Sequence, residues 1–200
     1  MSAVSQAKPN KIASVKLEDI LPYCKMPPEA KDLIEGVPDA QGAIDILTKN
    51  EYLLEATRLY AQALPDRESV WWACMCAYHT APEDLDETLR KPRDLAEAWV
   101  RSQKDDVRRA AMAAAKALDM QGPEAWCASA AFYSGDSISP IAFPPNKPAP
   151  HLSGIAVAAA VLLASLRGDA SRQQTRLARF LESAQDISGG GSGRLPVEKP

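Results

Sequence analysis

Two cysteines and a histidine lie close together near the middle of the chain and could carry chemistry. Cys74, Cys76 and His79 fall within six consecutive residues. Thiolates and imidazole nitrogens are common ligands of zinc, and a thiolate beside an imidazole can act as a nucleophile assisted by a general base. The cluster therefore admits two kinds of site, a metal site and a cysteine-dependent active site.

The element that carries these residues decides whether they can converge. On an α-helix, Cys76 and His79 share a face at a spacing of three residues, whereas Cys74 points elsewhere. A tetrahedral zinc site would need Cys24 or Cys127 as well, and the chain has no Cys-x-x-Cys pair. Since buried cysteine packs as a small hydrophobe, we expect a core role and predict no catalytic residue, metal ligand or cofactor. A cysteine/histidine-dependent enzyme and a metal-stabilised regulator stay open as alternatives.

The cysteines belong to a stretch that we expect to form the central helix, residues 67–80. Asp66 is predicted to cap this helix, and Glu68 in its first turn suits the helix dipole. The run from Val70 to Tyr78 is apolar on every side, whereas a surface helix has one apolar stripe. Neighbours should therefore bury it on several sides. A second apolar helix is predicted at 152–166, shorter than the ~18 residues that suggest a membrane span, and we interpret it as the second buried element.

The rest of the chain predicts an all-α fold. Apolar residues recur at helical spacing, and no strand-like alternation of any length occurs. We expect a single-domain multi-helix bundle of stacked helical hairpins over residues 16–187, with Arg176 on the solvent side of its last helix. Residues 1–15 are polar and unpatterned and predict a disordered arm. The Gly/Ser-rich residues 188–200 predict a flexible tail.

One long connection interrupts the helices at residues 134–151. It holds five prolines (Pro140, Pro144, Pro145, Pro148 and Pro150), which disfavour regular structure. A connection of this length inside a domain is uncommon and is often functional. We expect three apolar side chains to pin this proline-rich loop across the helices and to leave a groove or docking edge: Ile138, Ile141 and Phe143.

Adjacent tryptophans supply a further candidate contact. Trp71 and Trp72 point about 100° apart on a helix, so they cannot fill one pocket. We expect one to lie deep and the other near the surface or under a loop. Because aromatic side chains often anchor protein interfaces, an exposed one would be a partner contact. The predicted partner-binding residues are Trp71, Ile141, Phe143, Pro144 and Pro145.

Composition limits the classes of partner. The formal net charge is −3 and the pI is about 5.5, and no segment concentrates Lys and Arg with aromatics, so we expect no nucleic-acid binding. The first residues lack a signal-peptide layout, and four cysteines without export are typical of reduced thiols. We therefore expect a cytoplasmic protein without a membrane span. The sequence predicts no oligomeric state.

Residues 63–74, Ala-Leu-Pro-Asp-Arg-Glu-Ser-Val-Trp-Trp-Ala-Cys, resemble the signature of a family of uncharacterised bacterial helical proteins. Residues 125–132, the proline-rich loop and residues 156–164 are also similar to that family, so the resemblance covers roughly residues 40 to 185. The family is associated with type VI secretion loci. The resemblance implies a non-enzymatic, protein-binding accessory, an adaptor or chaperone-like protein for a secretion component or effector, and it transfers no catalytic residues.

Overall fold

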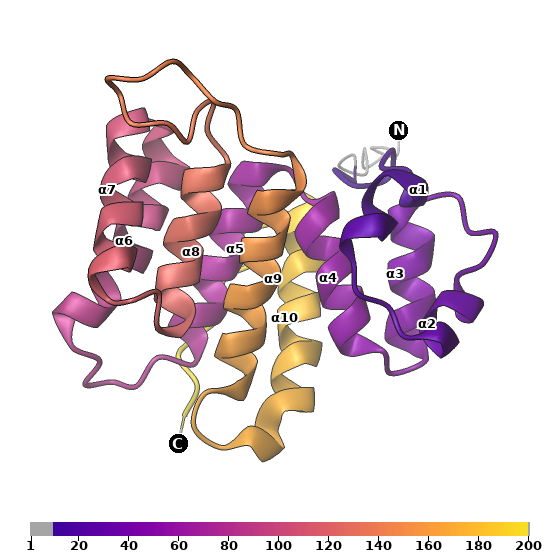
Figure 1. The fold of residues 1–200 in the computed structure, drawn as a ribbon. Coiled ribbons are helices and arrows are strands. Elements are labelled where there is room, and N and C mark those ends of the chain that lie inside the picture. Colours follow the sequence, from indigo (N-terminus) through magenta and orange to yellow (C-terminus); the bar gives the residue numbers. More distant parts are fainter. Residues whose placement is uncertain (1–9, 200) are drawn as a thin grey trace, which may run out of the picture.

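The structure, a computed structural model, describes residues 10–199 and consists of helices joined by short connections and one long loop (Figure 1). No strand occurs in this range, where the only extended pairing is an isolated bridge between Lys16 and Asp39. The predicted all-α multi-helix bundle is confirmed. Its elements are α1 (Leu17–Ile20), η1 (Leu21–Tyr23), α2 (Pro28–Leu33), α3 (Ala40–Lys49), α4 (Leu53–Ala63), α5 (Asp66–His79), α6 (Glu87–Ser102), α7 (Asp105–Ala117), α8 (Gly122–Tyr133), α9 (His151–Leu166), η2 (Ala170–Arg172) and α10 (Gln173–Ser188).

Helix α5 lies at the centre of the bundle, behind α8 and α9 in the view of Figure 1. It packs against α6, α8, α9 and α10, and Val70, Trp72 and Cys76 are fully buried. Burial on several sides is as predicted from the all-round apolar run. The predicted cap is different, because Pro65 is the N-cap residue and Asp66 is the first helical residue. The Asp66 carboxylate therefore contributes its charge near the helix N-terminus and no capping hydrogen bond.

The last helix carries a buried arginine where a solvent-facing one was predicted. Arg176 on α10 is only 4% exposed. Its guanidinium donates to the backbone carbonyls of Ser165 (3.0 Å) at the end of α9 and Asp169 (3.3 Å) in the α9–α10 connection, and to the Glu198 carboxylate (2.7 Å). A guanidinium has five donors in a planar fork, so it can serve several acceptors at once and lie buried without losing hydrogen bonds.

Residues 189–199, predicted to belong to a flexible tail, pack against α5 and α10. The Ser183 hydroxyl donates to the carbonyl of Gly193 (2.6 Å), and the Glu198 amide donates to the carbonyl of His79 (2.7 Å). The packed region therefore extends beyond the predicted boundary, because helix side chains and carbonyls satisfy this segment's backbone groups.

The N-terminal boundary also differs from the predicted one. Ile12 is fully buried and Lys11 pairs with Glu68 on α5 at 2.7 Å, so residues 10–15 belong to the packed part of the chain. The rest of the predicted disordered arm, residues 1–9, lies outside the described residues. Along residues 10–199, no helix is both long enough and apolar enough to cross a membrane.

Candidate functional site

The proline-rich loop between α8 and α9 is held at its base by arginines of α7. Arg108, 2% exposed, donates to the carbonyls of Phe132 (2.9 Å) and Ser137 (2.7 Å), and Arg109 donates to the carbonyl of Ser139 (2.7 Å). A Cβ atom at Gly135 would overlap the Arg108 guanidinium, so a glycine is required for this close approach. Two guanidinium groups therefore fix where the loop leaves the bundle.

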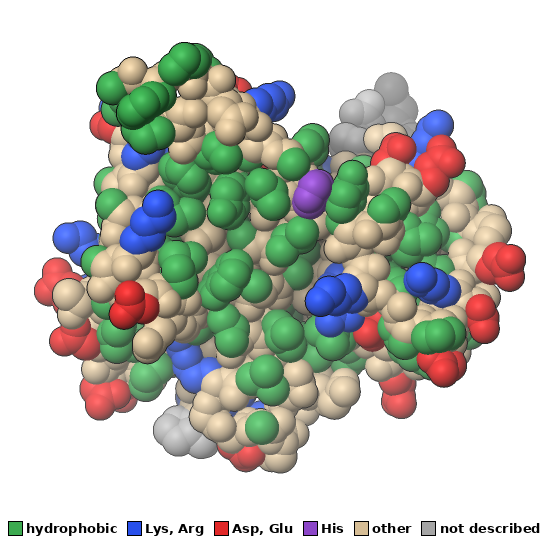
Figure 2. All heavy atoms as spheres, viewed as in Figure 1, with side chains coloured by type: hydrophobic (Ala, Val, Ile, Leu, Met, Phe, Trp, Pro, Cys, Tyr) green, Lys and Arg blue, Asp and Glu red, His purple; other side chains and the backbone are tan. Residues whose placement is uncertain are grey.

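The two arms of the loop are also joined to each other. The Ile138 amide donates to the Asn146 carbonyl (2.8 Å), and the Asn146 amide donates to the Ser137 hydroxyl (3.0 Å). These bonds close the loop below residues 139–145, which form its tip. The tip carries Ile141 at 82% and Phe143 at 65% exposure. Hydrophobic side chains cover the outer end of this loop in Figure 2.

The loop prediction is wrong about what holds the loop in place. Ile141 and Phe143 do not pin the loop across the helices, because both point most of their surface to solvent. A proline-rich segment without regular structure has carbonyl groups that need donors, and Arg108 and Arg109 supply them. The Ile141 and Phe143 side chains are therefore not needed to hold the loop and stay exposed to solvent. Pro144 and Pro145 beside them are exposed as well.

The loop anchor makes a testable prediction. Replacing Arg108 with methionine leaves the Phe132 carbonyl without its side-chain donor and the Ser137 carbonyl with only the longer bond from Arg109 (3.3 Å). We expect a loss of about 2 kcal/mol in the free energy of unfolding. The rate of amide hydrogen exchange should increase more in residues 134–150 than in the rest of the chain. Arg109→Met is the matched control and should have the smaller effect, because the Arg109 side chain is 20% exposed against 3% for Arg108. Equal effects of the two substitutions would contradict the assignment of Arg108 as the main anchor.

As predicted, one tryptophan of the pair lies deep in the core and the other lies near the surface under another segment of the chain. Trp72 is fully buried and its indole N–H donates to the Phe180 carbonyl of α10 (2.8 Å). Trp71 is half-buried under the C-terminal segment, where its indole N–H donates to the Ser192 carbonyl (2.7 Å) and Arg194 lies 5.9 Å from the ring centre. Trp71 also lines a pocket with Lys11 and other residues that does not include the loop. The structure therefore brings the four predicted loop residues together and leaves Trp71 apart from them.

All four cysteines are buried free thiols. Burial raises the pKa of Cys24 to about 12 and raises the pKa values of Cys74 and Cys76 well above their ordinary value. Because the thiolate is the nucleophile and the metal ligand, these environments favour the inert form. Among residues 10–199, no three or more His, Cys, Asp or Glu side chains are grouped so that they could hold a metal ion.

His79 is engaged in packing as well. It is 1% exposed, its ring meets Phe180 edge-on with centroids 5.8 Å apart, and its Nδ1 atom hydrogen-bonds the Pro196 carbonyl. A carbonyl can only accept, so Nδ1 carries the proton. The histidine thus joins α5, α10 and the C-terminal segment.

Sequence reasoning missed an apolar face on α9. This helix has no Asp, Glu, Lys or Arg among its 16 residues. It was predicted to be buried, and α4, α5 and α8 do cover part of it. The face that they leave uncovered is partly or largely exposed and consists of Ile155, Ala158, Ala159, Leu162, Leu163 and Leu166. All-round apolarity was the available signal, and it does not distinguish a buried helix from one that keeps a face for a partner.

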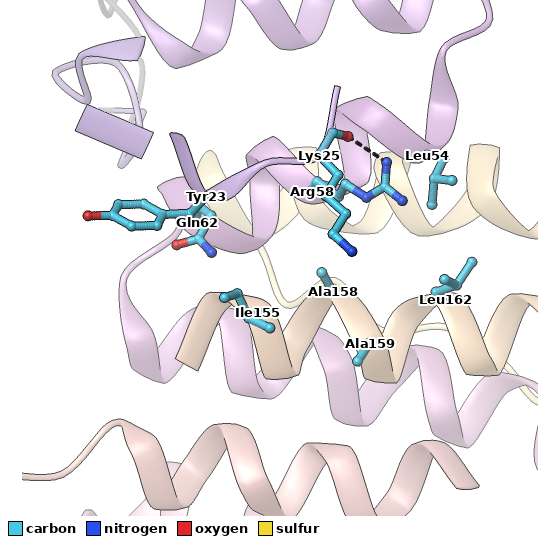
Figure 3. A pocket seen from close by; sticks show the side chains of 9 residues that line it. All are labelled: Tyr23, Lys25, Leu54, Arg58, Gln62, Ile155, Ala158, Ala159 and Leu162. Atoms are coloured by element: carbon cyan, nitrogen blue, oxygen red, sulfur yellow. Dashed lines mark hydrogen bonds between the residues drawn. The ribbon is translucent and has the colours of Figure 1, made fainter. Parts of the chain in front are cut away.

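Part of this face, formed by Ile155, Ala158, Ala159 and Leu162, lines a groove between α4 and α9 (Figure 3). It encloses about 210 Å³, and its charged lining residues are Lys25 and Arg58. At one end the Tyr23 and His151 rings stack with centroids 4.0 Å apart. Hydrophobic side chains gather over α8 and α9 on the same side of the molecule (Figure 2).

Comparison with known families places the chain. Residues 43–188 match the model of DUF6931, described as a family of unknown function. The chain belongs to this family. No curated protein and no solved structure matches the chain.

The DUF6931 region runs from α3 to the end of α10 and contains the whole proline-rich loop and α9. The Tyr23 and Lys25 side chains of the groove precede the matched region, and residues 189–199 follow it. The loop tip is thus built entirely from the DUF6931 region, whereas the groove combines it with the N-terminal part of the chain.

Proposed function

We propose that this protein is a non-enzymatic binding protein, an adaptor or chaperone-like accessory that holds a protein partner. The observation that supports this most directly is the display of Ile141 and Phe143 at the tip of a loop whose base is fixed. The resemblance of residues 63–74 to proteins associated with type VI secretion loci suggests the partner, a secretion component or effector.

The physical argument rests on exposure combined with fixed position. Large apolar side chains that project together lose contact with water when a partner covers them, which is worth about 25 cal/mol per Å² of apolar area. The arginine anchors and prolines reduce the number of conformations that binding must restrict, and so reduce the entropic cost of association. An aromatic and an aliphatic side chain at the tip are suited to enter a partner's pocket.

The enzyme and metal alternatives have less support. The thiols that would act as nucleophile or ligands are buried, and burial raises the pKa values of Cys74 and Cys76. His79 is bound to the C-terminal segment and does not face a cavity with a thiol. The exposed apolar tip is therefore the feature on which the proposed function depends.

The double substitution Ile141→Ser/Phe143→Ser tests this function. Binding to purified secretion components and effectors, measured by biolayer interferometry, should weaken at least about 30-fold, because hot-spot side chains contribute about 2 kcal/mol or more. Thermal stability should be unchanged, since both side chains are mainly exposed.

Leu89→Ser on α6 is the matched control, because Leu89 is 44% exposed but lies far along the chain from the loop. It should leave binding intact. A partner that binds the tip variant as tightly as the parent protein would exclude the loop tip as the docking site.

A further inference from the structure

The uncovered face of α9 is a second surface that the loop tip does not explain. Ile155, Leu163 and Leu166 are 42%, 37% and 41% exposed. With the smaller residues between them they form a stripe at helical spacing from 155 to 166, which is about 16 Å long. Other surface helices of the bundle place charged residues where they meet solvent, as Arg90 and Asp94 on α6 do. On α9 the solvent-facing side has no such residue.

The part of this surface that faces α4 is concave. Helix α4 forms the opposite wall with Leu54, Arg58 and Gln62, and the Tyr23–His151 stack closes one end. Figure 3 shows Ile155, Ala158 and Leu162 directed from α9 toward the space between the two helices. A groove lined by one apolar helix face fits the apolar ridge of another helix.

The charges along the groove have one sign. Lys25 and Arg58 are the only charged residues among those that line it, although the whole chain has a formal net charge of −3. Figure 3 shows the Lys25 ammonium extending toward α9. It forms no ion pair with any residue from 10 to 199. Arg58 is bound to Glu55 (3.2 Å) and to the Lys25 carbonyl (2.7 Å) through a single guanidinium nitrogen, so its other nitrogens can donate to another acceptor.

We propose that this groove binds an acidic amphipathic helix of the partner protein. The apolar ridge of that helix lies along the α9 stripe, and its Asp or Glu side chains pair with Lys25 and Arg58. This inference rests on the proposed function, because it assumes a protein partner, but it assigns a different surface and a defined partner chemistry.

Synthetic helices test the charge preference directly. Two fluorescent peptides of about 15 residues, or about four helical turns, share a leucine ridge and differ only in carrying Glu or Lys beside it. By fluorescence anisotropy on the full chain, the Glu peptide should bind about tenfold more tightly than the Lys peptide. The difference should shrink as salt is raised, because exposed ion pairs are screened.

Substitutions in the groove then locate the site. Ile155→Glu should abolish binding of the Glu peptide, because Ile155 lines the groove and the substitution puts a like charge there. Lys25→Glu should reverse the preference in favour of the Lys peptide. Leu89→Glu is the matched control, because Leu89 on α6 is 44% exposed against 42% for Ile155, and this variant should bind as the parent does. Circular dichroism and thermal melting show that each variant is folded.

Several results would overturn the assignment. Equal binding of the two peptides, no binding of either, or an equal loss in Leu89→Glu would exclude an acidic helix in this groove. Binding of the chain to phosphatidylserine vesicles in place of the peptides would indicate a membrane surface. A dimer in sedimentation equilibrium that Ile155→Glu dissociates would show that a second copy of the chain fills the groove.

The parallel measurement of the tip variant separates this inference from the proposed function. A secretion component that loses binding to Ile141→Ser/Phe143→Ser, but keeps it with Ile155→Glu, would overturn the groove assignment alone. A chain that binds the Glu peptide through the groove, but no protein through the tip, would contradict only the role of the loop.

Discussion

Replacing Arg176 with methionine is expected to lower the free energy of unfolding by about 3–5 kcal/mol, the cost of removing one partner from a buried ion pair. The substitution removes the Arg176 donor from the carbonyls of Ser165 and Asp169 and leaves the Glu198 carboxylate paired only with Arg172 (3.0 Å). The Glu198 side chain is only 11% exposed, so water replaces these bonds poorly. Urea unfolding followed by circular dichroism measures the loss.

Arg179→Met on the same helix is the control for this substitution. Arg179 is exposed, and a surface change of this kind should alter the free energy of unfolding by less than about 0.5 kcal/mol. Arg176→Met and Arg179→Met remove the same charge, so a difference between them reports the buried contacts. Similar small effects would mean that the C-terminal segment does not depend on Arg176.

The same ion pair gives this prediction a pH dependence. Burial opposes ionisation of Glu198, but the hydrogen bonds and charge of Arg176, with Arg172, outweigh it and hold the pKa of the carboxyl below its ordinary value. A depressed pKa stabilises the fold above the unfolded pKa of about 4.3. That contribution is lost as the pH falls through the lower, folded value. Glu198→Gln should therefore lose less stability than the parent protein when the pH is lowered below about 4.

Replacing Trp72 with alanine is also expected to have a large effect, a loss of about 3–5 kcal/mol in the free energy of unfolding. Trp72 is fully buried at the centre of the bundle, beside Tyr60 at a centroid distance of 6.2 Å. Its removal leaves a cavity that a close-packed core fills only in part, and it leaves the Phe180 carbonyl without its donor. Urea unfolding measures the loss.

The neighbouring tryptophan is the matched control. Trp71→Ala removes the same side chain from a half-buried position, and we expect a loss of about 1 kcal/mol. Its effect should be local, with faster hydrogen exchange in residues 189–199, because the indole N–H holds the Ser192 carbonyl. If Trp71→Ala destabilised the protein as much as Trp72→Ala, the division of the pair into a core and a covered residue would be wrong.

Local patterns in the sequence were enough to predict the all-α class and the central helix. The all-round apolar run from Val70 to Tyr78 predicted a helix covered on several sides, and α5 is such a helix. Asp39 is a residue type that commonly caps helices, and its carboxylate accepts from the Gly42 amide at 2.8 Å. The divergence of Trp71 and Trp72 followed from the helical repeat alone. These features depend on residues within a few positions of one another.

The tip of the proline-rich loop was predicted in part. Ile141, Phe143, Pro144 and Pro145 were selected as partner-binding residues because apolar side chains lie among prolines in a long connection, and the structure places all four at the surface. The reason for their exposure could not be predicted. It depends on Arg108, whose bond to the Ser137 carbonyl joins residues 29 positions apart.

The sequence by itself determined which segments are helical, which helix is central and where the chain lacks regular structure. Only the tertiary structure decided which charged residues are buried and which side of the second apolar helix is exposed. Arg108 and Arg176 are buried because distant carbonyls and a carboxylate lie within reach of their guanidinium groups. Helix α9 keeps an exposed face because its neighbours cover only part of it. Helix formation depends on neighbours along the chain, whereas burial of a charge or a helix face depends on which elements pack against it.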